Sequence, residues 1–209
     1  MRKLIDINTW SRKEHYEFFS TFEEPFYGIT VDVDCTHAYG RSKELGRSFF
    51  STYLYASLKA ANSVDAFRYR IIDNEVYDYD VIHASPTIAR KDGTFGFSYI
   101  DFHNDLETFD RGVQSEVDRV QSTAGLGEPA SKINVIFYSS LPWLKFTSLS
   151  HARRFSVGGS CPMISFGKMT EANGKRSMPM SVHVHHALVD GSHVGEYVDA
   201  FQRCLNGGD

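Results

Sequence analysis

The chain has 209 residues, of which 42% are hydrophobic and 14% aromatic, and its formal net charge is −4 at pH 7. One hydrophobic core suffices for a chain of this length, so we expect a single domain over residues 1–209. The negative charge and the lack of a long Lys/Arg run argue against nucleic-acid and anionic-membrane partners.

Three widely spaced cysteines, Cys35, Cys161 and Cys204, form no CxxC pair. Their odd number and their spacing disfavour a disulfide framework and a structural zinc site. The N-terminal residues carry charges at Lys3 and Asp6, lack the apolar segment of a signal peptide, and are followed by no run apolar enough to span a bilayer. We therefore expect a soluble protein of the reducing cytoplasm.

The first predicted elements are a helix, a strand and a second helix. Ser11 and Glu14 have the spacing of a capping box, in which each side chain pairs with a free amide of the first helical turn. A short helix is therefore expected to begin at Arg12. Residues 29–35 alternate apolar and polar side chains, which predicts a half-buried strand, and a longer helix is expected over residues 42–62.

Strands dominate the prediction for the rest of the chain. A second capping-box pattern at residues 104–107 predicts a helix, residues 125–129 a loop, and residues 194–205 a last amphipathic helix. The predicted strands are two around the turn at Asp73-Asn74, then residues 86–89, 95–102, 133–140, 161–167 and 178–186. This order predicts an α/β (α+β) fold, with helices packed on a large mixed sheet.

The segment VHVHHALVDG, residues 182–191, combines a strand pattern with three histidines. Because side chains alternate along a strand, His186 shares a face with Val182 and Val184, whereas His183 and His185 lie on the opposite face. An apolar environment disfavours the charged form of the imidazole and so keeps the ring neutral, as a general base requires. The alternative for His186 is a core histidine with satisfied hydrogen bonds.

His183 and His185 have a spacing that metal ligands also use, and Asp190 or His193 could complete such a site. A HisxHis pair alone is a weak signal, and no further carboxylate or thiol with ligand spacing stands out. We therefore interpret His183 and His185 as paired surface or interface histidines and expect no metal.

Several motifs together resemble one enzyme family. HHALVDG at residues 185–191 has the pattern HHxxxDG and resembles the active-site segment of the classical trimeric chloramphenicol O-acetyltransferases. Condensation domains of peptide synthetases and dihydrolipoamide acyltransferase cores share that pattern. W-x-R-x-E-H at residues 10–15, S-x-L-P-W at residues 139–143 and CPMISFGK at residues 161–168 also match the acetyltransferases, in the family's order. The resemblance covers nearly the whole chain and implies a single-domain two-layer sandwich.

The resemblance implies the chemistry of the site. His186 would act as the general base on the acceptor hydroxyl, which attacks acetyl-CoA directly in a ternary complex, and Ser139 would donate to the oxyanion. Asp190 and Arg12 would pair as structural support, while a backbone carbonyl orients the imidazole. Lys168 would lie near the phosphates of coenzyme A.

The resemblance also implies a homotrimer with active sites at the subunit interfaces and a small hydroxylated acceptor. Aromatic residues near the N-terminus, among them Phe19 and Tyr27, would line the acceptor pocket together with Ser165, although core packing is equally compatible with each aromatic. Phe19 and Phe137 replace a tyrosine and an asparagine of well-known members, so the acceptor preference is expected to differ. Arg153 and Arg154 are a second candidate for contacting the phosphates of coenzyme A, but we interpret them as loop surface. The alternative function is a non-catalytic or metal-binding paralogue that sequesters a ligand.

Overall fold

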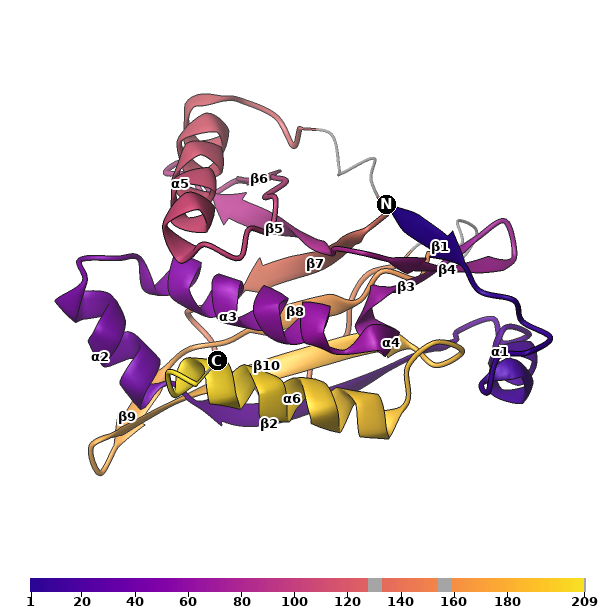
Figure 1. Cartoon of the computed structure of the whole chain (residues 1–209). Helices are drawn as coiled ribbons and strands as arrows, with labels where there is room; N and C mark the ends of the chain where they lie inside the picture. The colour runs from indigo at the N-terminus through magenta and orange to yellow at the C-terminus, as the bar shows by residue number, and fades with distance from the viewer. Residues whose placement is uncertain (128–132, 154–158, 209) are drawn as a thin grey trace.

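The computed structural model describes residues 1–127, 133–153 and 159–208, and two sheets organise this part of the chain (Figure 1). The seven-stranded sheet has the order β2-β10-β8-β7-β5-β6, with β9 paired to β10. Its strands are β2 (Phe26–Asp34), β5 (His83–Ala89), β6 (Phe95–Phe97), β7 (Val135–Ser140), β8 (Met163–Phe166), β9 (Thr170–Ala172) and β10 (Lys175–His185). The small sheet has the order β1-β4-β3, with β1 (Arg2–Leu4), β3 (Tyr69–Ile72) and β4 (Glu75–Tyr79).

Helices cover one face of the large sheet, which makes the two-layer arrangement (Figure 1). In chain order the helices are α1 (Lys13–Phe19), α2 (Thr36–Glu44), α3 (Phe49–Ser63), α4 (Asp65–Arg68), α5 (Leu106–Ser122) and α6 (Gly191–Leu205). Of these, α2, α3, α5 and α6 contact strands of the large sheet, whereas α1 lies at one end of the molecule (Figure 1). Pairing is parallel between β5 and β7 and between β7 and β8, and antiparallel between β8 and β10 and between β10 and β2. The predicted mixed sheet with packed helices is therefore confirmed.

The core lies between this sheet and the helices α3 and α6. Leu58 of α3 and Phe201 of α6 are fully buried, as are Ile164 of β8 and Val184 of β10. The apolar periodicity predicted for the last helix is confirmed, because the residues that α6 buries recur every three or four positions. Burial of this apolar face, rather than local propensity alone, holds the helices on the sheet.

Several predicted element boundaries are wrong. The single helix expected over residues 42–62 is two helices, α2 and α3, because Gly46 follows α2 with a φ of +63° and turns the chain out of the helix. The capping box expected from Ser11 is absent, since the N-cap of α1 is Arg12 without a side-chain cap. The cap of α5 is Asp105, one residue later than expected, and its carboxylate accepts from the amide of Thr108 at 2.8 Å.

Several strand predictions also differ from the structure. The strand expected over residues 95–102 ends at Phe97, after which Ile100 makes only an isolated bridge to Ala84. Strands β1 and β9 and the short helix α4 have no counterpart in the prediction, because each is too short to show a period. β10 begins at Lys175, before the expected residue 178. The loop expected to reach Pro129 extends outside the described residues.

No helix among the described residues is long and apolar enough to cross a membrane.

Candidate active site

His186 lies directly after β10, where three neighbours fix it. Its amide donates to the carbonyl oxygen of Pro25 at 2.8 Å, which continues the pairing between β10 and β2 by one residue. Its ring stacks on Phe19 of α1, with centroids 3.9 Å apart and planes inclined by 7°. The ring of Tyr27, from β2, lies 4.5 Å away at 43°. The imidazole is thus held between α1 and β2, on the helix-covered face that strand parity predicts.

The turn after His186 leads into α6. The amides of Leu188 and Val189 both donate to the carbonyl of His185 at 3.0 Å, and both side chains are buried. Asp190 then caps the helix, where its carboxylate accepts from the amide and hydroxyl of Ser192 at 3.2 and 2.7 Å. The sequence HHALVDG therefore places the histidine and the helix cap at fixed positions relative to one another.

Arg12 and Asp190 form an ion pair, with Nη1 and Oδ2 2.5 Å apart and side chains 12% and 28% exposed. Burial opposes ionisation of Asp190, but hydrogen bonds from Ser192 and Arg12 outweigh it and hold the pKa of this carboxyl well below its usual range. The pair fastens the start of α1, which carries Phe19, to the start of α6. The contacts of Asp190 do not include the imidazole of His186, so the described residues form no Ser-His-Asp triad.

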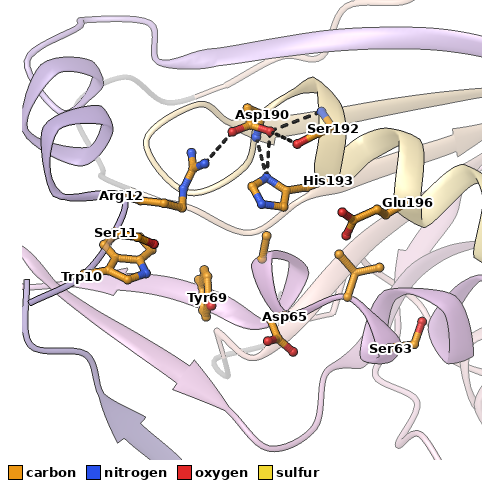
Figure 2. A pocket seen from close by; sticks show the side chains of 12 residues that line it. Trp10, Ser11, Arg12, Ser63, Asp65, Tyr69, Asp190, Ser192, His193 and Glu196 are labelled. Atoms are coloured by element: carbon orange, nitrogen blue, oxygen red, sulfur yellow. Dashed lines mark hydrogen bonds and ion pairs between the residues drawn. The ribbon is translucent and has the colours of Figure 1, made fainter.

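A cavity of about 550 Å³ lies beside this ion pair (Figure 2). Arg12, Asp190 and His193 line it together with Trp10, Tyr69 and neighbouring polar side chains. His186 and Ser139 are not among the lining residues, so this cavity is separate from the predicted chemistry.

The hydrogen bond that the resemblance implies for the imidazole is not formed. Nδ1 of His186 is buried and has no hydrogen-bond partner among the described residues, whereas a backbone carbonyl was expected to hold it. The ring orientation in this structure therefore depends on stacking.

Ser139 lies elsewhere in the same chain. It stands in β7 level with Ser165 of β8, which in turn is level with Ser181 of β10. These three serines occupy the sheet face opposite the helices, since Tyr138 and Val182 beside them in sequence belong to the core. His186 is five positions beyond Ser181 on β10, about 16 Å at the rise of a strand. One chain therefore does not bring His186 and Ser139 together.

The predicted acceptor-binding residues form two groups, one around His186 and one beside Ser139. Phe19 and Tyr27 surround His186, while Phe137 and Ser165 accompany Ser139 on the opposite face. Phe137 is 37% exposed, and Ser165 is fully buried with its hydroxyl 3.4 Å from Nε2 of His151.

Lys168 follows β8 and has an exposed side chain. Its amide donates to the carbonyl of Leu144 at 2.7 Å, which ties it to the loop after β7. Gly167 permits this approach, because a Cβ there would lie 2.8 Å from the same carbonyl oxygen. Trp143 and Leu144 of that loop are 70% and 58% exposed. Lys168 therefore lies next to a loop that exposes two apolar side chains.

His183 and His185 have packing roles that the sequence did not show. His183 lies over Gly28 of β2, where an added Cβ would approach its Cε1 to 2.4 Å, and its ring meets His151 edge-on at 4.8 Å. A surface location is wrong for His185, which is 8% exposed and packs against Phe26. Burial lowers the pKa values of His151 and His185 to about 4.

The metal alternative gains no support. Asp190 and His193, which were considered as completing ligands, contact each other at 2.9 Å instead. In residues 1–127, 133–153 and 159–208, no group of three or more His, Cys, Asp or Glu side chains is arranged to hold a metal ion.

Arg153 is not the loop-surface charge that was expected. It is 17% exposed, pairs with Glu24, and lies over the ring of Phe26 at 3.4 Å. Arg154, grouped with it in the prediction, lies outside the described residues.

Comparisons with known proteins agree with this architecture. The family model described as chloramphenicol acetyltransferase matches residues 2–202. A chloramphenicol acetyltransferase from Bacillus pumilus is 28% identical over 201 residues, which cover 95% of this chain and 91% of that protein. A solved chloramphenicol acetyltransferase structure matches with a TM-score of 0.92 and 32% identity, covering 98% of this chain and 100% of the other. A probable dihydrolipoamide acetyltransferase from Listeria monocytogenes shares the fold alone, with a TM-score of 0.61, 13% identity, and 93% and 89% coverage.

The two-layer fold and these likenesses define an acyltransferase. The match of the family model over almost the full length then identifies the family. The chain belongs to the chloramphenicol acetyltransferase family. This membership favours an enzyme over the non-catalytic alternative.

Proposed function

We propose that the protein transfers the acetyl group of acetyl-CoA to a hydroxyl of chloramphenicol or of a similar amphipathic alcohol. The observation that carries the proposal is the placement of His186 at the end of β10, clamped on Phe19, in a chain that matches the family over residues 2–202. His186 Nε2 takes the proton of the acceptor hydroxyl as its oxygen attacks the thioester carbonyl. The thiolate of coenzyme A leaves and is protonated, and no acyl-enzyme forms.

Ser139 donates its hydroxyl to the oxyanion of the tetrahedral intermediate. Since His186 and Ser139 of one chain lie on opposite faces of the sheet, a complete site requires Ser139 from a second copy. We propose a homotrimer in which each interface joins the His186 group of one subunit to the Ser139 group of the next. Arg12 and Asp190 support this arrangement by holding α1 and α6 in place.

The two halves of the acceptor pocket would come from the same two groups. Phe19 and Tyr27 face the acceptor from the side of His186, and Phe137 and Ser165 from the side of Ser139. Phe137 adds exposed apolar area at the position beside the oxyanion donor, which favours an acceptor with an apolar part. Lys168 would contact the phosphates of coenzyme A, and the cytoplasm, where acetyl-CoA is formed, is the proposed location.

Release of the coenzyme A thiol tests the proposal. Purified protein is mixed with acetyl-CoA and chloramphenicol, and a panel of hydroxylated aromatic compounds follows. We expect thiol release that depends on acceptor and that falls by at least about a hundredfold in His186→Ala, the scale of a lost general base. His103→Ala, which removes an exposed histidine before α5, should retain wild-type turnover. Turnover by His186→Ala at the wild-type rate would refute the assignment.

A further inference from the structure

Ser139 lies where β7 loses one of its two neighbouring strands. The pairing of β7 with β5 ends at Tyr138, whereas the pairing with β8 continues through Ser139 and Ser140. Beyond the end of β7, the amide of Leu141 still donates to the carbonyl of Phe166 in β8 at 2.8 Å. Among the described strands, β8 alone therefore pairs with β7 at the position of the proposed oxyanion donor.

Two hydrogen bonds between α3 and β7 lie on either side of this position. The hydroxyl of Ser57 is 2.8 Å from the hydroxyl of Tyr138. The hydroxyl of Tyr53 is likewise 2.8 Å from the hydroxyl of Ser140. Because side chains alternate along a strand, Tyr138 and Ser140 point toward the helices while Ser139 points to the opposite face. The residues immediately before and after Ser139 are thus both fastened to one helix.

The bond to Tyr138 belongs to a buried network of hydroxyls. Ser57, Tyr138 and Tyr197 of α6 are buried, and the hydroxyl of Ser57 also lies 2.7 Å from that of Tyr197. Burial raises the pKa of Tyr53 to about 12 and also raises the pKa values of Tyr138 and Tyr197, so the three phenols stay protonated at neutral pH. A buried hydroxyl is costly in any arrangement that leaves it without a partner. The network therefore specifies the position of β7 on α3 more narrowly than apolar packing alone would.

We propose that Tyr53 and Tyr138 are positioning residues for the oxyanion donor: their hydrogen bonds to α3 and β7 partners hold the hydroxyl of Ser139 where the tetrahedral intermediate forms. This inference rests on the proposed role of Ser139. A misplacement of about 1 Å in an active site can cost about a hundredfold in rate, so even a small shift of β7 weakens the donor. Both phenol hydroxyls lie on the core side of the sheet, so they act on the reaction through Ser139.

The double variant Tyr53→Phe with Tyr138→Phe tests this role, because it removes both hydroxyls and keeps both rings. Ser57 keeps its second partner in this variant. With acetyl-CoA and chloramphenicol, or the best acceptor of the panel, we expect kcat to fall about tenfold and both KM values to stay within about twofold of wild type. Tyr55→Phe is the matched control on α3, since its hydroxyl bonds a backbone carbonyl of the loop before α5 at 2.6 Å. It should retain the wild-type kcat.

Combination with Ser139→Ala separates positioning from a general loss of structure. If the two phenols act through Ser139, the double substitution should leave kcat unchanged in the Ser139→Ala background, where no donor remains to be positioned. An equal fall in both backgrounds overturns the inference, and so does a wild-type kcat in the double variant. A wild-type kcat in Ser139→Ala alone would instead refute the oxyanion role in the proposed function, and the inference with it.

Amide hydrogen exchange gives a second measurement, which needs no turnover. In the double variant, peptides that contain residues 139–141 should exchange at least about threefold faster than in wild type, because local opening of this end of β7 becomes easier. Peptides from β4 in the small sheet serve as the reference and should be unchanged. No increase at residues 139–141, or an equal increase in β4, overturns the inference even if kcat falls.

Discussion

Mixed assemblies of two inactive variants test how the active site is divided between subunits. Ser139→Ala keeps His186 but loses the oxyanion donor, which we expect to cost about 10²- to 10³-fold in kcat. His186→Ala keeps Ser139 but loses the base. Neither variant contains a complete site by itself, because each lacks one of the two residues. In one chain His186 lies about 16 Å along the strand direction from the level of Ser139, and the two residues lie on opposite faces of the sheet.

Mixing restores activity only when the two residues come from different subunits. In a random 1:1 assembly, about a quarter of the interfaces pair an intact His186 from one variant with an intact Ser139 from the other. The mixture, co-expressed or refolded together, should therefore show about a quarter of the wild-type thiol-release rate. Each variant refolded alone serves as the control. A mixture no more active than the sum of the two variants would refute the division, because it would place both residues of each site in one chain.

Three further predictions concern packing, charge and acceptor choice. Gly28→Ala should lower the free energy of unfolding, measured in urea, by about 1–3 kcal/mol, because the added Cβ would clash with the ring of His183. Gly40→Ala is the control: its Cβ meets open space, so the substitution should be neutral or stabilising. Asp190→Asn should lower the free energy of unfolding by about 2 kcal/mol at pH 7. Because folding depresses the pKa of this carboxyl, the difference in unfolding free energy from wild type should be constant above pH 5 and shrink as the pH falls through and below 3.8. A difference that grows toward acid would contradict this. Phe19→Tyr combined with Phe137→Asn should raise kcat/KM for chloramphenicol, because each change returns a hydrogen-bonding group to the acceptor pocket, and an unchanged or lower value would contradict the role given to these side chains.

The parts of the fold that follow from local pattern were predictable. The amphipathic period of α6 and the alternation over residues 29–35 depend only on neighbouring side chains, and both elements are present. The break between α2 and α3 was missed, because a single glycine with positive φ ended a helix whose apolar pattern continues.

For the site, strand parity places His186 on the helix face, but parity cannot say what stacks on it. Phe19 reaches the imidazole from a helix that is distant in sequence. The contact between His183 and Gly28 depends on the register of two strands, which a sequence without a partner strand does not define. Whether Nδ1 of His186 finds a hydrogen-bond partner likewise depends on the tertiary structure around the ring, which the sequence alone does not define.

The place of β10 in the sheet affects how the chain acquires its activity. In the described part of the chain β10 is the last strand in sequence order, yet it lies between β2 and β8. Among the described strands β2 pairs with β10 alone in the large sheet, so this pairing waits until β10 has been synthesised. Pairings between such distant segments form slowly and leave strand edges exposed meanwhile. His186 directly follows β10 and its amide continues this pairing, so it takes its place beside β2 in the same step that joins β2 to the sheet.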